Sequence, residues 1–530
     1  MRPTKMKSAF LKTRLLLAAM VAVASLTATA HAAAPGITGP TFNLTAQPAF
    51  LNQPDGSSVY SWGYGCNGAP SGFAPAAITG ASCPSMQVPG PTLIVTEGQT
   101  VTVNLTNGLP SSAGNTSILF PGFNVTSSGG TTGLLAQEAA PGGSVTYTFV
   151  AGSPGTRAYY SGTQGDLQVE MGLYGAVIVL PAHVPAACST GLPTTNPGAN
   201  LTAEAHWGEA DYRLSAAAYD HPKTCYDREY LFQFSEMDAN IHAQALAQVT
   251  ALSGCIAGAA GCSLTVPTEP YHPGYFMING RSMPDDMDGN YAVEYPHQPY
   301  NGNPHMHPGE QVLLRIIGQG RWQHPFHEHA NHVRILARDA NLIVSATDPN
   351  SLAGPALFTT TTTPGLAMDG IFYYTGRGLN WDMYAHNPTS TDPLATLGCT
   401  PDANGYNTGA PTAVNYFEWC QDHNKPLQVA PFGDVAAGGP VTLPDANIFT
   451  NGNWYSGSPY LGPNATTRAT GTTSDFLPSN TQGNPANERG FAFMWHSHNE
   501  REITTNNLFP GGMMMMMLID SREFVIDEQN

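Results

Sequence analysis

Two short segments of the chain, residues 324–332 and 495–498, carry histidines at spacings that suit a metal site. Six of the 17 histidines lie in them: His324, His327, His329, His332, His496 and His498. Successive side chains of a β-strand point to opposite faces, so His327 and His329 share one face, and so do His496 and His498. Core packing alone does not require such a concentration of imidazoles.

If the two segments lie side by side, four imidazoles meet at one place. Imidazole suits Cu, Zn, Fe and Ni, so we expect one metal ion or a close pair there, with His324 and His332 as further candidate ligands. The alternative is that hydrogen bonds alone retain these histidines. Clustered His-x-His pairs favour the metal.

The composition excludes several other kinds of site. With 20 Lys and Arg against 38 Asp and Glu, the net charge is -18, so no nucleic acid or anionic lipid partner is expected. Neutral molecules or cations suit such a chain better. It has no glycine-rich phosphate loop, no His-Glu-x-x-His helix and no Gly-x-Ser-x-Gly elbow, and no catalytic residue is assigned.

The elements that must position the histidines are predicted to be strands. Residues 101–105, 145–149 and 333–336 alternate apolar and polar side chains. The 56 Gly and 44 Pro argue against long helices. One helix is expected at residues 237–250. These features predict an all-β chain built from sandwiches or barrels.

The length suits two to four domains. We expect a first domain at residues 40–182 and a second at residues 200–384. Residues 385–487 are rich in Gly, Pro, Asn and Thr, and form a long insertion or a weakly marked third domain. Residues 488–530 form a C-terminal strand segment that carries the second histidine pair.

The N-terminus is predicted to be an export signal. Residues 1–34 combine a positively charged start, an apolar run at residues 15–26 and the small-x-small sequence Ala30-His31-Ala32, which is typical of a cleaved Sec signal peptide. An uncleaved anchor is the alternative, but the run is short for a membrane span. We therefore expect a periplasmic or secreted protein with no membrane span.

The cysteines fit an exported protein. All eight follow residue 34, and an even count in an oxidising compartment favours disulfide bonds. About 105 connectivities are open to eight cysteines. The simplest one joins sequence neighbours: Cys66 with Cys83, Cys188 with Cys225, Cys255 with Cys262, and Cys399 with Cys420.

Several motifs resemble those of the multicopper oxidases. Residues 88–95 resemble the opening of that family, residues 172–175 the end of its first domain, and residues 275–280 its middle region. Residues 324–329 and 495–498 resemble its third and fourth copper motifs. The resemblance implies tandem cupredoxin-like Greek-key β-sandwich domains.

The same resemblance implies that much of the family's copper machinery is missing. Residues 117–122 and 159–162 stand where the family has its first two histidine motifs, yet they contain no histidine. At the blue copper position Ser497 replaces the cysteine, Glu502 a histidine and Asn507 the axial methionine. The thiolate on which a blue copper site depends is therefore absent.

Three further features leave alternatives open. The oxygen-rich set around Ser497 and Glu502 would suit a harder cation such as Mn or Ca, although we favour a surface charge network. Residues 513–517 are five consecutive methionines, which could bind Cu(I) but are better explained as core filling. His305-Met306-His307 could bind a second copper, or form an exposed turn.

The sequence thus predicts an exported copper-binding protein with a reduced histidine site. We expect a copper-dependent oxidoreductase that holds one or two copper ions, with another transition metal as the alternative. A small molecule or metal ion would supply electrons, and dioxygen or peroxide would accept them. Two alternatives are a non-catalytic cupredoxin scaffold of the cell envelope and a copper carrier or resistance protein.

Overall fold

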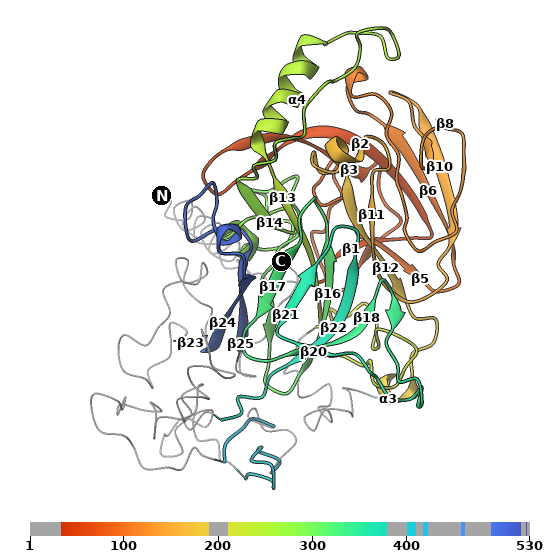
Figure 1. Ribbon diagram of the computed structural model, residues 1–530. Helices are drawn as coiled ribbons and strands as arrows, with labels where there is room; N and C mark the ends of the chain where they lie inside the picture. The colour runs from red at the N-terminus through yellow and green to blue at the C-terminus, as the bar shows by residue number, and fades with distance from the viewer. Residues whose placement is uncertain are drawn as a thin grey trace, which may run out of the picture.

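The computed structural model describes residues 33–189, 210–378, 400–409, 417–421, 457–461, 489–520 and 526. Strands dominate these residues and form two β-sandwiches that pack against each other (Figure 1). The predicted all-β, cupredoxin-like class is therefore confirmed. The predicted signal peptide and most of the predicted insertion at residues 385–487 lie outside the described residues.

In the described part of the chain, the first sandwich consists of two sheets of five strands each. One has the order β11 (Gly155–Tyr160), β12 (Tyr174–Leu180), β5 (Leu93–Thr96), β1 (Gly36–Thr38) and β4 (Phe73–Ala74). The other has the order β3 (Ser58–Cys66), β2 (Thr41–Asn52), β6 (Thr100–Asn107), β10 (Ser144–Val150) and β7 (Thr126–Ser128). A small hairpin, β8 (Thr131–Thr132) and β9 (Gln137–Glu138), and two short helical turns, η1 (Ser111–Ala113) and α2 (Gly165–Gln168), lie on its connections.

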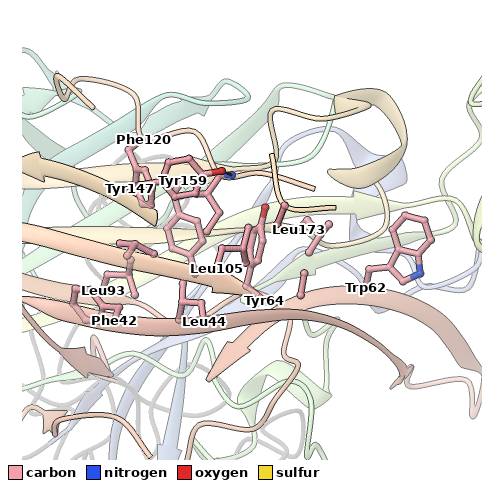
Figure 2. Packing of buried hydrophobic residues seen from close by; sticks show 14 of the residues in the cluster. Phe42, Leu44, Trp62, Tyr64, Leu93, Leu105, Phe120, Tyr147, Tyr159 and Leu173 are labelled. Carbon is pink, nitrogen blue, oxygen red and sulfur yellow. Dashed lines mark hydrogen bonds between the residues drawn. The ribbon is translucent and has the colours of Figure 1, made fainter. Parts of the chain in front are cut away.

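The predicted alternation explains the core of this sandwich. In β6, Val101, Val103 and Leu105 are buried while the residues between them are half-buried. They pack against side chains of the facing sheet such as Leu93 and Val177. Figure 2 shows this layer of apolar and aromatic side chains between the strands. Period-two alternation is what a strand with one buried face requires.

The second sandwich places a seven-stranded sheet against a six-stranded one. The first has the order β14 (Tyr275–Ile278), β13 (Arg228–Met237), β16 (Gln311–Gly318), β22 (Ala367–Tyr373), β18 (Val333–Arg338) and β19 (Asn341–Leu342), with β20 (Ala356–Leu357) on β18. The second has the order β15 (His305–Met306), β25 (Met514–Asp520), β24 (Arg489–Ser497), β17 (His324–Glu328) and β21 (Thr359–Thr362), with β23 (Gly457–Leu461) on β24.

Strands from distant parts of the sequence meet in this six-stranded sheet. The C-terminal β24 and β25, blue in Figure 1, pair with β17 and β15 from the middle of the chain. The shared core contains Phe326, Phe372 and Trp495, whose rings contact edge to face. Two histidine segments of the sequence are thus drawn into one sheet.

The two sandwiches are joined by a buried polar contact. The Thr156 hydroxyl of β11 donates to Asp369 of β22 at 2.6 Å, and Arg315 of β16 reaches both side chains. A close approach between two backbone segments explains why residue 280 is a glycine. Gly280, at φ +81°, lies against the backbone of Val88, and a Cβ there would collide with the Val88 carbonyl oxygen.

Helices are few in the described part of the chain. The expected helix is present as α4 (Ala239–Ala251), where the Asp238 side chain caps the Asn240 amide and Ile241 packs into the first core. Besides α2 and η1, the described residues also form α3 (Ala186–Ser189) and the turns η3 (Asp285–Met287) and η5 (Glu500–Ile503). Among the described residues, no helix is long and apolar enough to cross a membrane.

Three of the four predicted disulfide bonds are confirmed: Cys66–Cys83, Cys188–Cys225 and Cys255–Cys262. Cys420 is also disulfide-bonded, but its predicted partner, Cys399, lies outside the described residues. No described cysteine is a free thiol. Disulfide bonds therefore account for the described cysteines, and no thiolate is left for a metal among them.

Candidate metal centre

The two histidine segments form adjacent antiparallel strands. In the pair β17–β24, His327 lies opposite His496, while Glu328 lies opposite Trp495. Phe326 and Trp495 point into the core and are fully buried. Because side chains alternate along a strand, this anchoring turns His327 of β17 and His496 of β24 toward the other face of the sheet.

The four imidazoles of this pair, His327, His329, His496 and His498, are neighbours in space. The distances between ring centroids are 4.7 Å for 327–329, 4.9 Å for 327–498, 5.2 Å for 329–496, 5.3 Å for 496–498 and 5.8 Å for 327–496. The Nε2 atoms of His329 and His496 face each other at 3.2 Å. We call these four residues the histidine cluster.

Hydrogen bonds on the outer side fix two of the rings. His496 Nδ1 lies 2.7 Å from the Ser497 carbonyl oxygen, which can only accept, so Nδ1 carries the proton and donates. In neutral His496 the lone pair therefore sits on Nε2, which faces the cluster. His327 Nδ1 lies 2.7 Å from the Thr359 hydroxyl. Such outer partners commonly orient metal-binding histidines.

Burial favours the neutral form of two rings in the cluster, His327 and His496. Burial, and then the neighbouring His498 and His496, lower the pKa of His327 to about 4. Burial also lowers the pKa of His496. Metal binding requires the neutral form, so at neutral pH protons do not compete strongly for the ring nitrogens of His327 and His496. The His498 side chain is 53% exposed, so the cluster opens to solvent.

The donor set fits copper. Two nitrogens that each lie about 2.0 Å from one tetrahedral ion are about 3.3 Å apart, close to the spacing of His329 and His496. Imidazole is a ligand that copper accepts without sulfur. Within the described ranges, no three His, Cys, Asp or Glu side chains already surround a single ion position, so rings such as His327 and His498 would turn to complete a site.

The structure does not bring the other two candidate histidines into the cluster. His324 lies on the buried side of β17, and each of its ring nitrogens contacts a carboxylate, Glu502 at 2.9 Å and Glu236 at 3.0 Å. His332 is exposed, and its ring packs against Phe358 at 5.0 Å. Neither presents a nitrogen to the four clustered rings.

The blue copper position of the family is occupied by a buried charge cluster. Glu502 is fully buried, so the surface charge network that we favoured from the sequence is wrong for this residue. Its carboxylate accepts from the Ser497 hydroxyl and from Asn499. Asn507, by contrast, is exposed in a turn.

The two carboxylates beside His324 outweigh the effect of its burial. Burial alone would lower the pKa of His324, but Glu236 and Glu502 raise it to about 9.

Sequence reasoning missed Glu236. It lies in β13, whose ten residues are all buried. Glu236 Oε1 accepts from the backbone amides of Arg321 and Trp322 at 2.6 and 2.9 Å. A carboxylate in a strand that is buried along its whole length needs a buried polar partner, since an unpaired charge there would be costly.

The positions of the two missing histidine motifs carry hydroxyl and amide groups. The Ser117 and Thr163 hydroxyls lie 2.9 Å apart, and Thr163 donates to Glu138 at 2.8 Å. Ser161 donates to the Gln168 side chain at 2.6 Å. Hydrogen bonds thus satisfy polar atoms at both former motifs.

The two sulfur-containing features are parts of the core. Residues 513–517 are buried, and most of them belong to the core of the second sandwich, which fits the preferred explanation. His305 and His307 are also fully buried, so the exposed turn offered as an alternative is wrong. Their Nδ1 atoms contact Asp520, one its carboxylate at 2.5 Å and the other its backbone oxygen at 3.0 Å.

Comparison with known proteins agrees with these features. Residues 83–183 match the model of a multicopper oxidase domain. Laccase abr2 of Aspergillus fumigatus is 37% identical over 98 residues, a segment that covers 18% of this chain and 16% of the laccase. Residues 83–183 are therefore similar to a multicopper oxidase domain, and the matched segment spans about a sixth of the laccase.

Solved structures of similar fold include the multicopper oxidase mgLAC, at 15% identity and a TM-score of 0.43, which covers 92% of this chain and 88% of its own. The blue copper oxidase of Nitrosomonas europaea has 14% identity and a TM-score of 0.43, with coverage of 90% and 85%. A copper nitrite reductase of the same organism has 18% identity and a TM-score of 0.36, with coverage of 64% and 85%.

Proposed function

We propose that the protein is an exported copper-dependent oxidoreductase whose metal site is the histidine cluster. The convergence of four imidazoles from β17 and β24, with two Nε2 atoms 3.2 Å apart, carries the proposal. His327, His329, His496 and His498 would hold one copper ion or a close pair. The family relationship over residues 83–183 favours copper over zinc or iron.

When bound, copper would supply one-electron redox chemistry and a position for dioxygen or peroxide. Residues around the cluster would orient the imidazoles that hold the copper. Thr359 and the Ser497 carbonyl orient the rings of His327 and His496. The exposed side of His498 leaves a way in for substrate. Because the described cysteines are in disulfide bonds, electrons from a small-molecule or metal-ion reductant would reach the cluster directly.

An aromatic side chain marks this entrance. Phe358 is 53% exposed, and its ring lies edge-on to His327 at 5.6 Å. The backbone of Phe358 is held beside β17 because its carbonyl oxygen accepts from the Glu328 amide at 3.0 Å. A large exposed aromatic ring beside a metal site can hold the ring of an organic reductant.

Metal analysis of the purified protein tests the proposal. After reconstitution with Cu(II) and dialysis, the wild type should retain one or two copper ions, and His327→Ala or His498→Ala should lose at least one of them. His332→Ala is the matched control, because that ring lies outside the cluster, and it should retain full copper. A wild type that retains no metal would support the non-catalytic scaffold. Several weakly held Cu(I) ions, in a parallel titration with Cu(I) under a reductant, would support the carrier.

A further inference from the structure

A buried charge cluster lies directly behind the histidine cluster. His324 of β17, Glu236 of β13 and Glu502 of η5 are each at most 2% exposed. Glu502 lies 2.9 Å from His324 Nδ1, and Glu236 lies 3.0 Å from Nε2. We call these three residues the His324 clamp.

The bonding pattern of the clamp identifies its charge state. An ionised carboxylate only accepts, so both ring nitrogens of His324 donate and the ring is an imidazolium. The carboxylates bind opposite nitrogens, so an ion could reach the ring only by displacing one of them. Glu236 and Glu502 also accept from neighbouring groups, among them the Trp322 amide and Asn499. The clamp is therefore a satisfied ion pair that holds no metal.

The clamp joins the two strands that carry the histidine cluster. His324 lies three residues before His327 on β17. Glu502 accepts from the Ser497 hydroxyl, and Ser497 lies between His496 and His498 on β24. Each strand is thus tied to the clamp within three residues of a histidine of the cluster.

We propose that Glu502 and His324 are positioning residues for the histidine cluster: their ion pair holds β17 and β24 in the relative position at which the four imidazoles converge. Where a copper–thiolate site would tie these strands together, a buried imidazolium between two carboxylates does so here. This inference rests on the proposed function for its copper readout, but its structural readout does not need a metal.

Glu502→Gln tests the proposal, because it keeps the shape of the side chain and removes its charge. We expect its copper affinity, measured by competition with a chelator, to fall about 10- to 100-fold, as for other changes next to metal ligands. The Cu(II) electron paramagnetic resonance spectrum should split into more than one species. Ser497→Ala, which removes the hydroxyl that donates to Glu502, should show the same effect more weakly.

Glu310→Gln is the matched control. Glu310 is equally buried and pairs with Arg228 in the same sandwich, but not with the clamp. It should lower the melting temperature without changing the copper spectrum or affinity by more than about twofold. If Glu502→Gln and Ser497→Ala behave as this control does, the clamp only stabilises the fold and the inference is wrong.

A crystal structure of metal-free Glu502→Gln separates this inference from the proposed function. We expect the Nε2 atoms of His329 and His496 to move apart from their 3.2 Å spacing. If the wild type does not bind copper, the copper proposal is wrong, but the ring positions in the variant still test the role of the clamp. Unchanged ring positions in the variant would end the clamp proposal, whatever the wild type binds.

Discussion

His327 lies directly opposite His496 in the antiparallel pair of β17 and β24. This register brings together histidines that are far apart in the sequence; His329 and His496, whose Nε2 atoms face each other, are 167 residues apart. A slip of one residue would turn one of the two histidine pairs to the opposite face. The burial of Phe326 and Trp495 on the core side prevents that slip.

The first prediction concerns the former blue copper position. Ser497→Cys restores the family's cysteine, but both ring nitrogens of His324 already contact carboxylates, and Asn507 is exposed in a turn. We expect no intense blue thiolate-to-copper absorption from this variant and no phenol oxidation beyond that of the wild type. Visible absorption spectroscopy of the copper-loaded protein and a phenol oxidation assay, with Ser497→Ala as the control, measure both. Strong laccase activity would contradict the prediction.

Much of the fold could be predicted from local patterns. The alternation at residues 101–105 and 145–149 became β6 and β10, and the helix expected at residues 237–250 became α4. Period-two alternation and capping are local, so they can be read without tertiary structure. Which strands pair across the chain, as β24 does with β17, is a long-range property that the resemblance supplied.

The site could be predicted only in part, for a reason that Glu236 and His305 illustrate. The shared face of each His-x-His pair follows from strand geometry, but the contact of Glu236 with His324 joins strands that are distant in sequence. Nothing local distinguishes His305, buried beside Asp520, from a histidine in an exposed turn. Burial by distant strands decides the role of such residues.

The second prediction is a loss of stability at alkaline pH. His324 has a pKa of about 9 in the folded protein, against about 6.5 when unfolded. The folded state therefore binds more protons, and stability falls as pH rises. The contribution, about 3 kcal/mol, is fully present below about pH 6.5 and is lost as pH passes through 9. Calorimetry should show wild type and His324→Gln converging between pH 6 and pH 10; a constant difference would contradict this.

The third prediction treats the methionine run as core. Met517 is fully buried in the second sandwich, so Met517→Ala should lower the free energy of unfolding by about 2–5 kcal/mol. Met517→Leu keeps the volume and should cost less than about 1.5 kcal/mol. Neither should change the Cu(I) content measured by chelator competition. Loss of Cu(I) from Met517→Leu would instead favour the copper carrier.

The fourth prediction concerns Phe358 at the entrance to the histidine cluster. If its exposed ring holds an organic reductant, Phe358→Ala should raise the KM for a phenol about 2- to 10-fold, since an aromatic contact contributes about 0.5–1.5 kcal/mol. The KM for a reductant without a ring, such as Fe²⁺, should not change, and Phe358→Tyr should restore the phenol KM. Phe50, 48% exposed on β2 of the first sandwich, provides the control Phe50→Ala. Equal effects of Phe358→Ala on both reductants would show that this ring shapes the metal site and does not select the substrate.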